Sequence, residues 1–72
     1  MATITDGTAY IEIIDGAVKM SIPVGIIEEI ALDGEKVVIL TGKKRYVLDY
    51  NNITSPVVSS ADALYTALIS YL

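Results

Sequence analysis

Dipeptides that end in glycine divide residues 1–50 into short segments of β-forming residues. They are Asp6-Gly7, Asp15-Gly16, Asp33-Gly34 and Thr41-Gly42. Asp-Gly supplies the positive φ angles that tight hairpin turns require, so each dipeptide predicts a reversal of the chain. Turns this short place consecutive strands side by side and antiparallel. The spacing therefore predicts an antiparallel β-meander that is curled or barrel-like.

The segments between these turns predict five to six strands. The expected strands are Thr3 to Thr5, Ala9 to Ile14, Ala17 to Ile22, Ile26 to Leu32, Lys36 to Thr41 and Arg45 to Tyr50. The count depends on the segment PVGIIEEIAL, where Glu28-Glu29 interrupts the alternation of apolar and polar residues. A β-bulge or a single helical turn after Pro23 would explain the interruption, and we favour the bulge. Pro23 donates no ladder hydrogen bond, so we expect it at a strand end or a sheet edge.

The last residues predict one C-terminal α-helix. Ser59 or Ser60 can cap it, and Asp62 then lies in the first turn, where the helix dipole favours a negative charge. The apolar residues that follow the helical period are Ala61, Leu64, Tyr65, Leu68 and Leu72. The expected organisation is a single domain of residues 1–72 and of the mainly β (β+α) class. Its parts are a meander (1–50), a loop (51–59) and a helix (60–72).

Composition favours association with other copies of the chain. Only 72 residues are available to bury a core, and the absence of Cys and His removes disulfides and the commonest metal ligands. The chain is nevertheless 53% apolar and 19% charged, which is aliphatic-rich for a small domain. We therefore expect a homo-oligomer. The interface candidates, on the second face of a strand and at the end of the helix, are Val38, Leu40, Ile69, Tyr71 and Leu72.

Basic residues gather at one turn of a chain whose net charge is −4. Lys43, Lys44 and Arg45 fit a solvated hairpin turn, where lysines also discourage edge pairing. They could instead form a patch for an anion or a partner, such as phosphates or an acidic neighbouring protein. Because the net charge opposes nucleic-acid binding by the whole domain, we expect nucleic acid not to be a partner.

The sequence offers little to catalysis. It has no His to act as a base and no Cys nucleophile, and its glycines lack the spacing of nucleotide-binding loops. Asp33 and Glu35 supply too few oxygens for a calcium site. We therefore expect a non-enzymatic protein with no catalytic residues, metal or cofactor. The absence of a long apolar run and of a charged, apolar N-terminal leader predicts a cytoplasmic protein that does not associate with membranes.

The segments IIEEIALDGEKVVIL and RYVLDYNNITSPVVSSADALYTALISYL carry a resemblance. A last strand running into an Asn-Ile-x-Ser-Pro loop and then a Ser-Ala-x-x-Leu helix resembles the small accessory structural proteins of tailed bacteriophages. The resemblance implies a virion component, such as a capsid-decorating or head-to-tail joining protein, with other virion proteins as possible partners in the host cytoplasm and virion. It assigns no functional residue. The alternative is a small β-barrel that binds nucleic acid through the basic turn and Tyr46.

Overall fold

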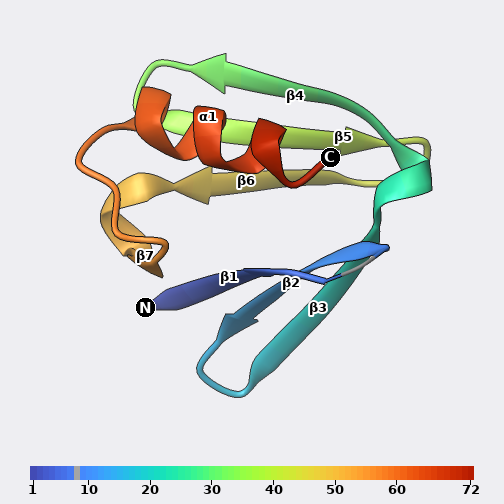
Figure 1. Cartoon of the computed structure of the whole chain (residues 1–72), viewed down its shortest axis with the longest axis horizontal. Coiled ribbons are helices and arrows are strands. Elements are labelled where there is room, and N and C mark those ends of the chain that lie inside the picture. Colours follow the sequence, from blue (N-terminus) through green and yellow to red (C-terminus); the bar gives the residue numbers. More distant parts are fainter. Residues whose placement is uncertain (8) are drawn as a thin grey trace.

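Two β-sheets and a C-terminal helix make up the part of the chain that the structure, a computed structural model, describes: residues 1–7 and 9–72 (Figure 1). The first sheet has the strand order β3-β2-β1-β7, and the second has the order β4-β5-β6. The strands of the first sheet are β1 (Ala2–Asp6), β2 (Tyr10–Asp15), β3 (Val18–Pro23) and β7 (Ile53–Ser55). Those of the second are β4 (Ile27–Asp33), β5 (Lys36–Thr41) and β6 (Arg45–Asp49). The mainly β class with one C-terminal helix is thereby confirmed.

Glycine turns set the hairpins, as their spacing predicts. Gly16 and Gly34 adopt φ angles of 62° and 63°. Each is the first residue of a two-residue loop, because Asp15 pairs with Val18 and Asp33 pairs with Lys36. This is a position at which hairpin loops need a positive φ, which glycine adopts without steric cost.

The meander divides into two sheets after Pro23. This proline ends β3, an edge strand of the first sheet, and a 3₁₀ turn, η1 (Val24–Ile26), then redirects the chain. The register of β4 against β5 shifts between Ile27 and Glu29, so Glu28 is the extra residue of a β-bulge. The predicted bulge is confirmed, and the helical turn that was its alternative is present as well.

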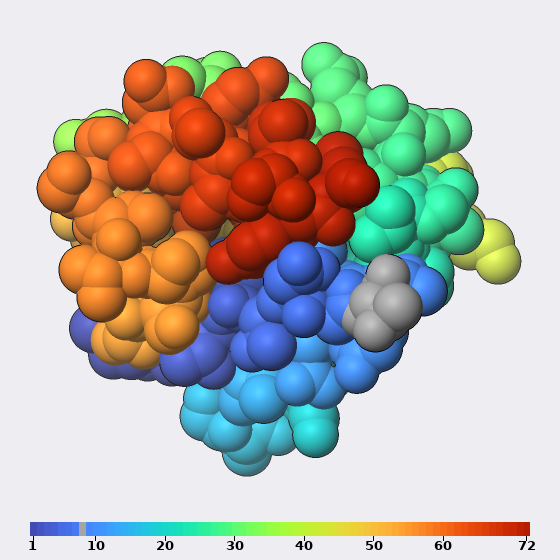
Figure 2. All heavy atoms as spheres, viewed as in Figure 1, coloured from blue at the N-terminus to red at the C-terminus, as the bar shows by residue number. Residues whose placement is uncertain are grey.

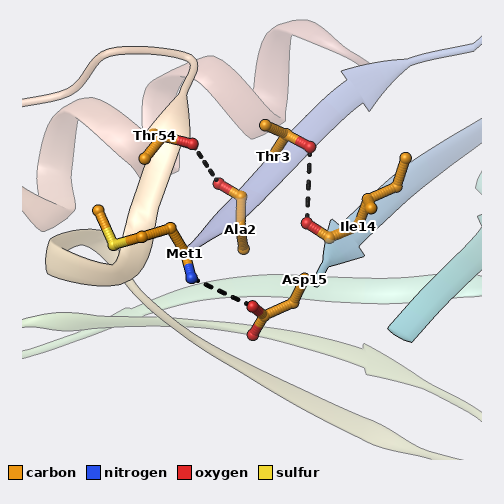
Figure 3. A network of polar contacts seen from close by, with 6 residues as sticks. All are labelled: Met1, Ala2, Thr3, Ile14, Asp15 and Thr54. Atoms are coloured by element: carbon orange, nitrogen blue, oxygen red, sulfur yellow. Dashed lines mark hydrogen bonds and ion pairs between the residues drawn. The ribbon is translucent and has the colours of Figure 1, made fainter. Parts of the chain in front are cut away.

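Residues 51–59, expected as a loop, contain part of a 3₁₀ turn and a short strand. A second 3₁₀ turn, η2 (Tyr50–Asn52), leads into β7, which pairs in parallel with β1. The hydroxyl of Thr54 donates a hydrogen bond of 3.1 Å to the carbonyl of Ala2, which ties the two strands together (Figure 3). In the same view the N-terminal amine lies 3.3 Å from Oδ1 of Asp15 on the exposed end of β2. One edge of the first sheet is therefore formed by a strand that is distant from β1 in sequence.

The helix α1 (Ala61–Ser70) lies over β4 and β5 (Figure 1). Ser60 is its N-cap, since the Ser60 hydroxyl accepts a hydrogen bond of 3.1 Å from the Ala63 amide. The core lies between the helix and the two sheets. Its largest fully buried side chains are Ile11, Ile13, Ile22, Val37, Ile39, Leu64 and Leu68.

The accessible surface of the described chain is 4308 Å². A folded monomer of this mass exposes about 4300 Å², so the chain is compact as a single copy. Any assembly would therefore join folded subunits through their surfaces. Among the described helices, none is long and apolar enough to cross a membrane.

Candidate interaction surfaces

The second sheet has one face that the core does not use. Val37 and Ile39 of β5 point into the core, so the alternate residues of the same strands lie on the opposite face, which we call the open face. The strand register arranges the open face in rows that run across the sheet. These rows are Asp33, Lys36 and Asp49; Ala31, Val38 and Val47; and Glu29, Leu40 and Arg45. The middle row is apolar and is flanked by charged rows.

Burial on the open face falls from the central strand toward its edge. Val38 is 5% exposed although it lies outside the core cluster, and its register partners are Ala31 on β4 and Val47 on β6. Leu40 is half-buried. Val47, on the edge strand β6, is 50% exposed. Val38 and Leu40 therefore lie together on one surface, as the alternation along β5 predicts, and Val47 extends that surface to the edge of the sheet.

The other interface candidates lie at the end of α1. Ile69 is 42% exposed and Leu72 is 54% exposed, whereas Tyr71 is half-buried and packs against the core. Ile69 and Leu72 are three residues apart, and the Leu72 amide donates a hydrogen bond to the Ile69 carbonyl, so their backbones share one turn. Figure 2 shows this end of the chain, in red, at the molecular surface. Leu40, Ile69 and Leu72 are thus at least partly exposed on two separate surfaces, whereas Val38 is buried and Tyr71 packs against the core.

The basic residues occupy an exposed turn that is closed by Thr41. The Thr41 hydroxyl accepts hydrogen bonds from the amides of Lys43 and Lys44, and it donates one to the Lys44 carbonyl. These amides are therefore already occupied and do not form a nest for an anion. The Lys44 ammonium lies 4.9 Å from the centre of the Tyr46 ring, in cation–π geometry. A base that stacked on this ring would have to displace the lysine.

Acidic residues lie beside the basic turn. A Cβ built at Gly42 would lie 3.8 Å from Oε2 of Glu28, and Glu29 and Arg45 flank Leu40 in the same row of the open face. Asp33 and the Gly34-Glu35 loop lie at the far end of the sheet. Glu28 and Glu29 therefore lie at the same end of the sheet as the basic turn and do not form a surface remote from it.

The described residues contain no cluster of three acidic side chains able to hold a metal ion. They also enclose no pocket suited to a small molecule. Four of the tyrosines pack partly buried against the core, and the fifth, Tyr10, is 41% exposed; the four are Tyr46, Tyr50, Tyr65 and Tyr71. The described residues therefore offer surfaces, rather than a pocket or a metal site, as candidates for function. Sequence reasoning missed Val47, although the alternation along Arg45 to Tyr50 already put it opposite Tyr46 and Leu48.

Comparison with protein families, curated proteins and solved structures gives no match to this chain.

Proposed function

We propose that this chain is a non-catalytic structural protein that acts by assembling with copies of itself into a homo-oligomer. The observation that carries the proposal is the apolar middle row of the open face, formed by Ala31, Val38 and Val47, which lies outside the core cluster and is 50% exposed at Val47. A three-stranded sheet with a partly apolar second face gains stability when another layer or another strand covers it. A second copy can supply either one.

The C-terminal surface supports a larger assembly. Ile69 and Leu72 expose about half of their surface, and they lie at the end of α1, which packs on the opposite face of the sheet from Val38. Two separate contact surfaces on one subunit allow rings or shells to form, whereas a single self-complementary surface stops at a dimer. We propose Val38, Leu40, Ile69, Tyr71 and Leu72 as interface residues on these two surfaces.

The biological setting that we propose is a tailed-phage virion. It rests on the resemblance of residues 26–40 and 45–72 to small accessory virion proteins, such as those that decorate capsids or join head to tail. Such proteins act through repeated contacts, which agrees with two apolar surfaces on one small subunit. Other virion proteins would then be partners in addition to the copies of this chain.

A nucleic-acid-binding role through Lys43, Lys44 and Arg45 is the second candidate. The exposure of all three side chains favours it. The net charge of −4 and the adjacent Glu28 weaken the local field that would attract phosphates. We therefore rank it below assembly.

Absolute mass by light scattering behind size exclusion, at low and at high salt, separates the two candidates. Apolar assembly predicts a defined multiple of 7.7 kDa in both salts, because burial of apolar surface is little screened by ions. A mass of 7.7 kDa in both salts, at every concentration tested, would refute assembly. Fluorescence anisotropy with a labelled single-stranded oligonucleotide would then test the basic turn directly.

A further inference from the structure

The strand β6 lies at the edge of the second sheet and is hydrogen-bonded along one side only. The Thr41 amide donates a hydrogen bond of 2.9 Å to the Lys44 carbonyl, which fixes the phase of the ladder. Because main-chain groups alternate in direction along an antiparallel pair, those of Tyr46 and Leu48 point toward β5. The amide and carbonyl groups of Arg45, Val47 and Asp49 therefore point away from β5, into the free flank of the strand.

The sequence of β6, Arg-Tyr-Val-Leu-Asp, is complementary to itself in the antiparallel direction. If two copies pair about Val47, then Val47 faces Val47 and each Arg45 faces an Asp49 of the other copy. The residues whose main-chain groups point outward are the ones that this register would join by hydrogen bonds. Arg45 and Asp49 also share the open face with Val47, so their side chains would meet on the same side of the joined sheet.

The other edges of the two sheets are less suited to pairing. The edge of β4 carries the bulge at Glu28, β7 is only 3 residues long, and β3 ends in Pro23 and carries an exposed Lys19. Bulges, short strands, prolines and lysines are devices that discourage edge pairing. The charges on β6 discourage most registers as well, but they favour the antiparallel register about Val47, in which opposite charges meet.

The inner face of β3 becomes more exposed toward the turn of the β2–β3 hairpin. Ile22, Met20 and Val18 alternate along β3 on the face that points to the core, and exposure rises from 0% at Ile22 to 56% at Val18. The second sheet ends at β6, and Figure 1 shows the hairpin of β2 and β3 below that strand in the view.

We infer that β6 is a self-association edge, which pairs antiparallel with β6 of a second copy about Val47 and joins two three-stranded sheets into one. The inference rests on the proposed assembly function and identifies one contact between copies within that assembly. Two-fold pairing places Val38 and Val47 of both copies in one apolar row across the joined sheet. The Asp49 carboxylate accepts a hydrogen bond from the Asn51 amide through Oδ1, which leaves its second oxygen for the partner's arginine.

Charge exchange tests the register. Arg45→Asp and Asp49→Arg each create two like-charge pairs across the two-fold axis, and each should weaken dimerisation about tenfold. The double variant restores opposite charges and should return the dissociation constant to within about threefold of the wild type. Lys43→Glu with Lys44→Glu is the matched control, since it changes charge in the same hairpin but outside β6, and it should leave the constant unchanged. Dissociation constants would come from sedimentation equilibrium.

Backbone methylation tests the edge without changing any side chain. A chain of 72 residues is accessible to chemical synthesis, so N-methyl-Val47 can be compared with N-methyl-Val57 in the exposed loop before α1. The first should abolish dimerisation while keeping the circular-dichroism spectrum, and the second should not. An oligomer whose mass survives both Arg45→Asp and N-methyl-Val47 would overturn the β6 inference and leave the proposed assembly standing. A wild-type protein that is monomeric at all concentrations would overturn both.

Discussion

Replacing Leu72 with Glu distinguishes a role for this residue in an interface from a role in the core of the monomer. Leu72 is 54% exposed, so about half of the 1.5–3 kcal/mol gained by burying a leucine is realised in the monomer. The free energy of unfolding should fall by about 1 kcal/mol, which lowers the melting temperature by about 4–8 °C. In an assembly that covers this residue, the remaining burial is lost and a carboxylate is desolvated, at a combined cost of about 3 kcal/mol. The dissociation constant should rise about a hundredfold.

Leu68→Ala is the matched control for that change. Leu68 lies one turn earlier and is 0% exposed, so its truncation leaves a cavity that costs about 2–5 kcal/mol. It should lower the melting temperature by at least about 10 °C. Thermal melts followed by circular dichroism, together with sedimentation velocity, measure both quantities. If Leu72→Glu unfolds the monomer as strongly as Leu68→Ala, or leaves the mass of an oligomer unchanged, then Leu72 is not an interface residue.

Further predictions concern the turns and the helix cap. Gly34→Ala forces a non-glycine residue to a φ of 63° and should cost about 1 kcal/mol of stability in chemical denaturation. Gly42→Ala should be tolerated, because a Cβ there makes only an ordinary contact. Ser60→Ala removes the helix cap and should cost about 1 kcal/mol, and a loss below 0.3 kcal/mol would show that the observed bond of 3.1 Å contributes little. Lys43→Glu with Lys44→Glu lowers the net charge by four units from −4 and should leave the oligomer intact, whereas dissociation into monomers would make the turn part of an interface.

Local patterns were sufficient to predict the elements built from neighbouring residues. The Asp-Gly pairs gave the hairpins because glycine alone adopts the positive φ at Gly16 and Gly34 without cost. Ser60 and the apolar period of the last segment predicted the start of α1 to within one residue of its observed position. The interruption at Glu28-Glu29 gave the bulge, since a residue that breaks alternation must either be unpaired or leave the strand.

Long-range pairing could not be predicted in this way. β7 joins β1 in parallel across almost the whole chain, and no local pattern encodes which distant strand a three-residue segment will meet. The separation into two sheets depends on the direction that η1 gives the chain after Pro23, which the sequence alone does not specify.

The candidate surface was predicted in part. Alternation along β5 placed Val38 and Leu40 on a second face, but it could not show that Val38 is only 5% exposed. The self-complementary order of charges in β6 is visible in the sequence. Its meaning depends on the ladder phase fixed by Thr41 and Lys44, which decides that Val47 presents its main-chain groups outward.

Hydrogen exchange at the Val47 amide tests the proposed pairing through β6 most directly, because this group lies on the free flank of β6 in one copy and inside a ladder in a pair. Exchange would be followed by NMR at a low and at a high protein concentration, with the amide of the core residue Ile39 as an internal reference. Pairing through β6 predicts fast exchange at Val47 when dilute and protection of at least about a hundredfold when concentrated. Exchange at Val47 that stays fast at both concentrations, with Ile39 protected throughout, would contradict pairing at this edge.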